Sequence, residues 1–367
     1  MHRRIASTRL VAIALFSISI PSISFAGAQV GTLTQIEGEV VVFSNPSKSL
    51  QAESDSRPHA LFEGEYYFYN KAKIGDRVEQ GNILRTALQG KARVVFDNGD
   101  QFNVGPGTSY RVFWNKDSKD ANTKVKLMYG KLRGIIEKGG PRSRLQVRTK
   151  AATMGVRGTD FYIADNGVDG ETEISIMRGS VEVKADTPAA KPIEVKSGYS
   201  ATIVPPKPVE KPAAQPAGVQ PVSAAVTPSV AAAPSVAAAA PAPLAPAVEL
   251  RRTTQEDLLG VQKASYMKKA ELTPAAAEAL PKEVLLKVKD LEVKAVETTL
   301  NDVKTHDPKL YAQLQEQKVQ DTEQINTRAV EVLFKEAPKA PPRRKPSPSD
   351  LEDLERGAYE KYFRILE

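Results

Sequence analysis

The chain has 367 residues, of which 41% are hydrophobic and 26% are charged, with 26 prolines and no cysteine. This length allows more than one folded unit, although the proline content indicates that part of the chain is linker. The absence of cysteine excludes disulfides and thiolate metal sites, and a net charge of +7 with both signs interleaved does not favour nucleic-acid binding.

Residues 1–26 have the features of a cleavable secretory signal. Three arginines precede the apolar run LVAIALFSISI, and Ser24 and Ala26 stand at the −3 and −1 positions of a cleavage site. Cleavage after Ala28 fits equally well, because Ala26, Gly27 and Ala28 form a second site of small residues. The run is shorter than the roughly 20 apolar residues of a membrane span. The sequence therefore predicts a periplasmic protein without an integral membrane segment after cleavage. Secretion and surface association stay open as alternatives.

Residues 27–204 are predicted to form a mainly β domain. Short runs of Val, Ile, Phe and Tyr are separated by glycine turns about every ten residues. Loosely repeated segments, in which a glycine precedes a short strand, predict stacked two-strand units of solenoid or sandwich character. The segment ETEISIMRGSVEV places apolar residues on both sides of an Arg178-Gly179 turn.

The clearest hairpin signal in this region is RVVFDNGDQFNV. Asn98 and Gly99 tolerate the positive φ of a two-residue turn. A turn centred on this pair would place Val95 opposite Phe102.

The segment AATMGVRGTDFYI, residues 151–163, is the most distinctive motif of the chain. A phosphate cradle would need glycines that lead into a helix, whereas TDFYI is typical of a strand. We interpret the motif as a bend at a sheet corner, allowed by Gly155 and Gly158, with Arg157 and Asp160 paired across it.

Residues 205–248 are rich in proline and alanine and are predicted to be a disordered, semi-rigid linker. Residues 249–337 then show helical patterns. Their predicted helix starts are Thr254 with Asp257, Thr273 with Pro274, and Asp307 with Pro308. An apolar stripe suited to helix packing or a short coiled coil is formed by Leu286, Val293, Val296, Leu300 and Val303.

The end of the chain has a basic, proline-rich linker at 338–348 and a predicted amphipathic helix at 349–367. Ser349 and Glu352 form a capping box, and the apolar residues that follow fall on one helix face. This helix is expected to dock on the helical region or on another protein.

Few residues of the chain suit catalysis. After signal cleavage, His59 and His306 are the remaining histidines and are expected at exposed turns or caps, so a catalytic triad or a multi-histidine metal site is not expected. Candidates for a carboxylate-dependent hydrolase are Asp97, Asp100, Asp160 and Glu171. The segment from Asp165 to Glu171 is weakly similar to a calcium loop, but a hairpin turn explains it better. We expect no enzymatic activity, no metal and no cofactor.

The segment RTKAATMGVRGTDFYI strongly resembles the signature of FecR-domain proteins, and the surrounding order of IGDRVEQGNILRT, ARVVFDNGDQFNVGPGTSYRV and TEISIMRGSVEVK matches as well. The resemblance covers about residues 31–204. It implies an all-β periplasmic module, which in the namesake proteins receives a signal from an outer-membrane transporter and passes it to a sigma factor. The namesake's cytoplasmic sigma-binding segment and membrane helix have no counterpart in this sequence, so the iron-signalling role is not carried over. The motif residues are expected to be structural: Gly155, Val156, Arg157, Gly158, Thr159, Asp160 and Phe161.

Two functional hypotheses follow. The first is a non-enzymatic scaffold in envelope signalling or assembly, whose β domain binds one envelope protein while tethered helices bind another. The alternative is a protein that binds peptidoglycan or another envelope glycan through aromatic residues such as Tyr66, Tyr67 and Tyr69. The same aromatic run could instead be a buried strand paired with GEVVVF, which we favour because tyrosine and phenylalanine are strand formers.

Overall fold

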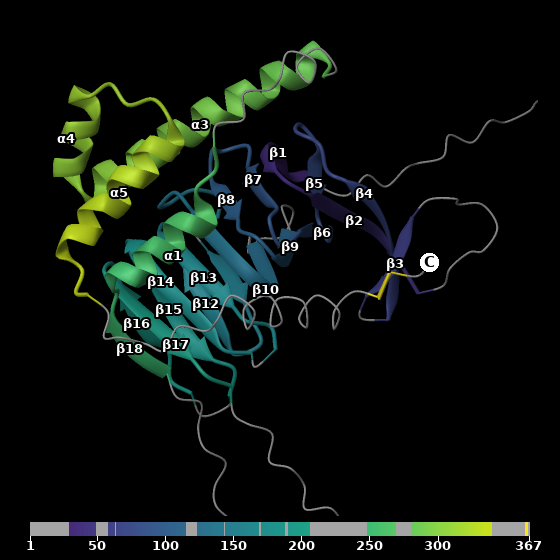
Figure 1. Ribbon diagram of the computed structural model, residues 1–367, viewed down its shortest axis with the longest axis horizontal. Helices are drawn as coiled ribbons and strands as arrows, with labels where there is room; N and C mark the ends of the chain where they lie inside the picture. The colour runs from purple at the N-terminus through teal and green to yellow at the C-terminus, as the bar shows by residue number, and fades with distance from the viewer. Residues whose placement is uncertain are drawn as a thin grey trace, which may run out of the picture.

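The computed structural model describes residues 29–48, 58–62, 64–114, 123–142, 144–168, 170–187, 190–205, 248–268, 280–339 and 364–365. These residues form two β-sheets and a layer of helices (Figure 1). The predicted signal peptide, nearly all of the proline-alanine segment, the predicted helix start at Thr273 and nearly all of 338–367 lie outside the described residues. The predicted fold class, a mainly β domain with a helical C-terminal region, is confirmed.

One sheet, which we name the capped sheet, is antiparallel throughout. In spatial order its strands are β5 (Arg77–Glu79), β1 (Gln29–Glu37), β7 (Lys91–Val95), β8 (Gln101–Val104), the second half of β10 (Thr123–Ile135), β13 (Asp160–Asp165), β14 (Thr172–Arg178), β17 (Tyr199–Ile203) and β18 (Val248–Arg252).

The other sheet, which we name the second sheet, includes one parallel pair, between β10 and β11. In spatial order its strands are β19 (Arg364–Ile365), β3 (His59–Phe62), β4 (Glu65–Lys71), β2 (Val40–Ser47), β6 (Ile83–Thr86), β9 (Ser109–Trp114), the first half of β10, β11 (Leu145–Arg148), β12 (Ala152–Val156), β15 (Ser180–Ala185) and β16 (Ile193–Lys196).

The main core lies between the two sheets. It combines fully buried residues of the capped sheet, such as Leu33, Phe102 and Ile163, with residues of the second sheet such as Leu84 and Met154. Alternate residues of each strand point into this layer, as the period-2 pattern requires. Burial of apolar area at about 25 cal/mol per Å² makes this layer the main source of stability.

The chain changes sheet repeatedly, and glycines lie at these corners. β10 passes from the second sheet to the capped sheet at Gly130, whose φ is +99°. Gly158, with φ +66°, connects β12 to β13, and Gly179, with φ +78°, connects β14 to β15. The Arg178-Gly179 turn is therefore a corner between sheets and not a hairpin, because β14 and β15 pair with different neighbours.

The hairpin at Asn98-Gly99 exists, but its predicted register is wrong by one residue. Val94 pairs with Phe102, and Val95 pairs with Gln101. The amide of Gly99 donates to the carbonyl of Phe96 at 2.9 Å, and the amide of Phe96 donates to the carbonyl of Asp100 at 2.9 Å. The loop therefore has three residues and ends in a positive-φ glycine, a common alternative to the two-residue turn.

The strand β18 places the two ends of the proline-alanine segment side by side. Residues 249–252, predicted to belong to a helical region, form an edge strand that pairs with β17, and Val248 lies opposite Ile203. The two ends of the segment between them are thus neighbours in one sheet. In the residues that the structure describes, the β domain and the helices contact each other directly.

Within the described residues after β18, the structure has the helices α1 (Gln255–Ser265), α3 (Lys282–His306), α4 (Pro308–Glu316) and α5 (Thr322–Glu336). The predicted capping box of Thr254 with Asp257 is present, and Asp307 caps α4 with Pro308 in its first turn, as predicted. Because each cap side chain accepts a backbone N–H that has no partner within the helix, these residues fix where the helices begin.

The predicted apolar stripe of α3 is wrong in its first half. Leu286 and Val293 are 66% and 57% exposed, whereas Leu291 and Ala295 of the same helix are buried against Val95. Apolar residues spaced seven positions apart suit packing against another helix, whereas α3 packs against the face of a sheet.

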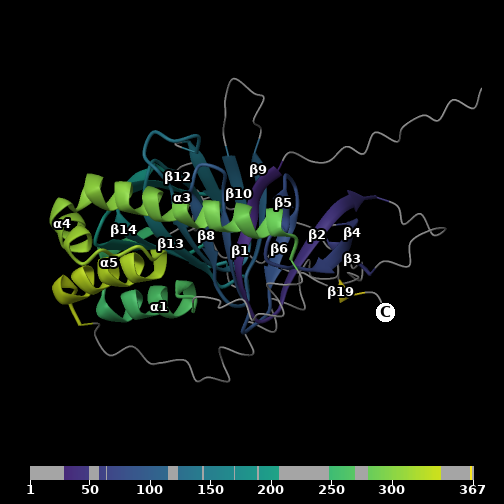
Figure 2. The ribbon, with the colours of Figure 1, turned by 90° about the horizontal axis from the view of Figure 1, so that it is seen from above.

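The helices lie on the outer face of the capped sheet, and α1, α3 and α5 run across it (Figure 2). We name these helices, with α4, the helical cap. Apolar contact with the sheet is concentrated in a cluster in which Tyr162 and Met177 meet Leu258, Val261 and Val330. Of the helices that the structure describes, none has the length and apolar character of a membrane span.

The predicted helix at 349–367 is described only at Arg364 and Ile365. These two residues form β19, which pairs with β3 at the edge of the second sheet.

Candidate functional site

The outer face of the capped sheet is unusually polar for a buried surface. Strand residues that alternate with the core face the helical cap, and polar or charged side chains occupy many of these positions: Arg93, Gln101, Asn103, Arg133, Asp160, Ser175, Arg178 and Ser200. All are buried in the folded chain. Because burying an unpaired charge is costly, this face depends on specific partners.

Asp160, the acidic residue of the VRGTD motif, lies at the centre of a charge network. Its two carboxylate oxygens accept from Nε and Nη2 of Arg133 at 2.8 and 2.7 Å, a two-pronged pairing. Nη2 of Arg178 lies 2.9 Å from the same carboxylate. Asp160 and the two arginines are at least 95% buried, so neither arginine could be held here without an acidic partner.

Arg178 also joins the sheet to α3. Its Nε donates to Asp302 at 2.5 Å, and Nδ1 of His306 lies 3.1 Å from Oδ1 of Asp302. His306 is the last residue of α3 and lies beside the corner glycine Gly179. The predicted exposed position of His306 is wrong, because the ring is largely enclosed between the cap and the sheet corner.

The pKa values of these groups shift in the directions that hold the network charged. Burial would raise the pKa of Asp302, but Arg178 and His306 outweigh burial and lower it. Burial would lower the pKa of Arg178, but Asp160 and Asp302 raise it. The hydrogen bond that the ring of His306 donates to the Asp302 carboxylate raises the pKa of His306 despite its partial burial. Asp302 is thus a carboxylate near neutral pH.

A second ionic contact joins β7 to the cap. Nη1 of Arg93 donates to Glu292 of α3 at 3.3 Å, and Nη2 pairs with Glu323 of α5. Burial lowers the pKa of Arg93, and the charge of Glu292 partly offsets this effect. One arginine therefore ties two helices of the cap to the sheet.

Hydrogen bonds complete the contact at the β7–β8 hairpin. Nε2 of Gln101 donates to Thr299 at 2.8 Å, and the hydroxyl of Thr298 donates to the carbonyl of Asn98 at 3.1 Å. The contact between cap and sheet is therefore polar along most of α3, as is typical of interfaces between domains.

Two of the acidic residues considered for hydrolysis, Asp100 and Asp160, are engaged by buried arginines. Asp160 is held by two arginines, whereas Asp100 pairs with Arg142 and accepts from the amide of Glu137. A glycosidase needs one carboxyl group free to give a proton and a second free to attack or activate water. These two carboxylates instead serve as counter-ions of buried arginines.

The other candidate groups have structural environments as well. Asp165 accepts from the amide of Gly167 and from the hydroxyl of Thr172, in the hairpin between β13 and β14. Within the part of the chain that the structure describes, no group of acidic, histidine or cysteine side chains is placed to hold a metal ion. His59 lies on β3, half-buried, with its ring edge-on to Tyr66.

The aromatic run at residues 66–69 is a strand and not an exposed platform. β4 pairs with β2, with Tyr69 opposite Phe43, as the preferred interpretation predicted. Tyr67 is buried, and its hydroxyl donates to Glu65 and accepts from Arg111.

The motif residues are divided between the core, the corner and the surface. Val156 and Phe161 are in the core, and Thr159 is buried next to Gly179. The predicted pair of Arg157 with Asp160 is wrong. Arg157 is exposed, because the bend at Gly158 turns the two side chains apart and Asp160 faces Arg133 and Arg178.

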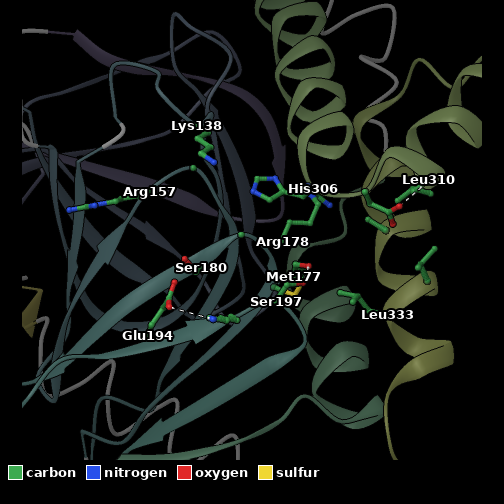
Figure 3. Close-up of a pocket in the computed structure, with 16 residues that line it drawn as sticks. Lys138, Arg157, Met177, Arg178, Ser180, Glu194, Ser197, His306, Leu310 and Leu333 are labelled. Carbon is green, nitrogen blue, oxygen red and sulfur yellow. Dashed lines mark hydrogen bonds and ion pairs between the residues drawn. The ribbon is translucent and has the colours of Figure 1, made fainter.

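A cavity of about 600 Å³, which we name the junction cavity, lies where this corner meets the helical cap (Figure 3). Lys138, Arg157, Arg178 and His306 line it together with apolar residues of α4 and α5. It is the point at which the VRG motif, the Arg178 network and the cap converge.

The sequence interpretation missed Arg133, Arg178 and Asp302. A usable signal was present, because Arg133 and Arg178 each precede a glycine, as Arg157 does in the motif. An arginine in an otherwise apolar strand indicates a buried counter-ion. The position of that counter-ion on α3, 124 residues away along the chain, could not be read from a local pattern.

Comparison with known proteins gives a family for part of the chain. Residues 82–182 match the family described as FecR protein. No curated protein matches the chain. Two crystal structures of a candidate anti-sigma factor from Parabacteroides distasonis are similar to it at 18% and 17% identity, with TM-scores of 0.29 and 0.28.

Each of these structural matches covers 33% of this chain and 54% of the other. The chain thus spans about half the length of these structures. The matched residues 82–182 run from the start of β6 to the middle of β15 and include the corner at Gly158, Asp160 and Arg178. The chain therefore contains a FecR-like domain, built around the sheet corner that bears the VRGTD motif.

Proposed function

We propose that this protein is a non-enzymatic interaction protein of the periplasm, in which the FecR-like domain and the helical cap act as one binding body in envelope signalling or assembly. The residues 1–26 support export, and the match of residues 82–182 supports a regulatory, protein-binding role. The predicted segments at 205–248 and 338–348 are linkers in this proposal.

The observation that carries the proposal is the ionic contact between cap and sheet. Arg93 and Arg178 are buried and paired with carboxylates of the helical cap, and the buried Arg133 donates to Ser265 of α1, so the charged groups of the candidate site hold two layers of the protein together. A hydrolase would need such groups to be free for a substrate. Their structural use favours an interaction module over a reaction centre.

The test is crosslinking in the native cell envelope, followed by mass spectrometry. The full chain should fractionate with the periplasm and form crosslinks to one or a few envelope proteins. A chain without residues 1–26 is the matched control, and it should stay in the cytosol and lose these crosslinks. Cytosolic retention of the full chain would contradict the proposal, as would crosslinks no more selective than those of the control.

Truncation is a poor test of which region binds the partner. A chain that ends at Val248 would lack the whole helical cap and every residue of β18 except the first. The charged outer face of the capped sheet would then be exposed. Single substitutions on the surface keep this face covered, so they separate loss of binding from loss of folding.

A further inference from the structure

The junction cavity combines positive charge on one wall with apolar side chains on the other. The positive wall comes from the β domain and includes Lys138 and Arg157, with Arg178 at its base. The apolar wall comes from β14, α4 and α5 and consists of Met177, Leu310, Ala329, Val332 and Leu333. In Figure 3, Lys138 and His306 lie on facing sides of the cavity, and Arg157 points away from His306 along the rim.

Three of the cationic groups have unused donor capacity. Within the described residues, no hydrogen bond or ion pair is formed by the side chains of Lys138 and Arg157. Nη1 of Arg178 has no hydrogen-bond acceptor there either, although the side chain is 95% buried. A buried guanidinium N–H without an acceptor costs free energy, and a ligand oxygen in the cavity would remove that cost.

The acidic side chains of the cavity are already engaged. Glu194 lies 3.8 Å from Lys196, and Asp307 accepts from the amide of Leu310 as the cap of α4. The hydrogen bond with Asp302 raises the pKa of His306, so the protonated ring adds a positive charge to the cavity below neutral pH. The cavity therefore has a net positive charge, and an anionic ligand complements it.

We propose that the junction cavity binds a segment of a partner protein in which a carboxylate stands beside an apolar side chain. This inference rests on the proposed interaction function and names the chemistry of the partner. The carboxylate would accept from Arg178 and Lys138, with Arg157 adding positive charge beside the cavity, and the apolar side chain would lie against Leu310 and Leu333. A volume of about 600 Å³ is within the range of about 300–1,000 Å³ that is usual for ligand sites.

The geometry also makes binding depend on the cap. The positive wall belongs to the sheet corner and the apolar wall largely to α4 and α5, so the cavity exists only when the cap is docked. A bound segment would contact both layers and stabilise their association. The ligand is thereby linked to the Arg178–Asp302 contact that holds the cap in place.

The experiment uses the full chain and an array of labelled short peptides that contain Asp or Glu next to Leu or Phe. The matched probes carry Asn or Gln in place of the acid. Fluorescence polarisation should reveal acidic peptides that bind roughly tenfold or more tightly than their amide counterparts. The double variant Lys138→Gln with Arg157→Gln should remove this preference. The control Lys124→Gln with Lys184→Gln makes the same change in net charge on exposed strand positions and should keep it.

Several outcomes would overturn the inference. Equal binding of acidic and amide peptides, or equal loss in both double variants, would mean that no specific carboxylate site exists. Binding of decanoate in the absence of any peptide binding would assign the cavity to a small amphiphile instead of a protein segment.

The same variants separate this inference from the proposed function. If envelope crosslinks to a protein partner persist unchanged in the Lys138→Gln, Arg157→Gln double variant, the interaction function stands and the junction cavity is not its site. If crosslinks are absent for the unaltered chain, the proposed function itself fails.

Discussion

Gly158 has to be glycine for two independent reasons. Its φ of +66° lies in the left-handed region, and a Cβ built on it would lie 2.4 Å from Cα of Lys138. The chain changes sheet at this residue, so the backbone of β12 and β13 passes close to the segment after β10. The glycine therefore determines where Asp160 enters the capped sheet.

Replacement of Gly158 by alanine should destabilise the protein more than the same change at Gly139. Gly139 also has a positive φ, of +81°, but a Cβ at that residue would have no atom of the described residues within 4 Å. We expect about 1–2 kcal/mol for the backbone strain at either site, and about 1–3 kcal/mol more at Gly158 for the clash. Urea unfolding of both variants measures the difference. Equal losses would mean that the corner relaxes without cost.

His306 gives the contact between cap and sheet a dependence on pH. Because its pKa is raised in the folded protein, its stabilising effect is complete below about pH 6.5 and is lost as the pH rises through the folded value. Asp302 has a lowered pKa, so its contribution is present above about pH 4 and is lost as the pH falls through its folded value. The contact should be strongest between these limits.

Unfolding free energies measured between pH 5 and pH 9 should therefore fall on the alkaline side, and this fall should be smaller in His306→Gln. The groups that face the ring include Asp302, which favours its charged form, and Arg178, which opposes it. His59→Gln, a substitution of the same kind on β3 outside this contact, is the control. An unchanged slope in His306→Gln would refute the assignment.

At the scale of elements, α3 shows how a sheet selects the face of a helix. The buried residues of α3 include Val288, Leu291, Ala295, Thr299 and Asp302, a face in which polar residues meet polar partners on the sheet. Leu286 and Val293, which an apolar pattern assigns to the interface, are exposed. Hydrophobic periodicity finds a helix reliably but does not identify the buried face when the partner surface is polar.

Two leucines of α3 allow a matched test of this orientation. Leu291→Ala should cost about 2–5 kcal/mol, because it opens a cavity against Val95 and Ala295. Leu286→Ala, the same change five residues earlier on the same helix, should stay within about 0.5 kcal/mol. Thermal or urea unfolding distinguishes the two. A larger loss at Leu286 would mean that α3 packs by the heptad face after all.

At the scale of the whole molecule, the sandwich and the cap form one body. Val248 pairs with Ile203, so the segment of residues 204–247 leaves and rejoins the sheet at the same place. The chain then passes through α1 onto the outer face of the capped sheet and reaches β19 on the second sheet. The C-terminal part of the chain thus contacts both sheets.

A specific protease site introduced between residues 206 and 247 tests this arrangement. After cleavage, the two fragments should elute together in size-exclusion chromatography under native conditions and separate in denaturant, because strand pairing and the Arg178–Asp302 contact persist. Fragments that separate without denaturant would support two independent bodies joined by a tether.

Local patterns in the sequence determined the β class of residues 27–204, the caps of α1 and α4, the pairing of the aromatic run with GEVVVF and the FecR-like motif. Each of these features depends on residues that are close together in the sequence, and local patterns predict their conformation. The register of the β7–β8 hairpin was missed by one residue, because Asn98-Gly99 suits both a two-residue and a three-residue loop.

Only the tertiary structure decided that β18 completes the capped sheet, that Arg178 binds Asp302, and that a cavity forms at this junction. These features join residues that are far apart in the chain. β18 is held by backbone pairing with β17, whereas Arg178 needs a counter-ion because it is buried. No local pattern in the sequence identifies which distant segment supplies either partner.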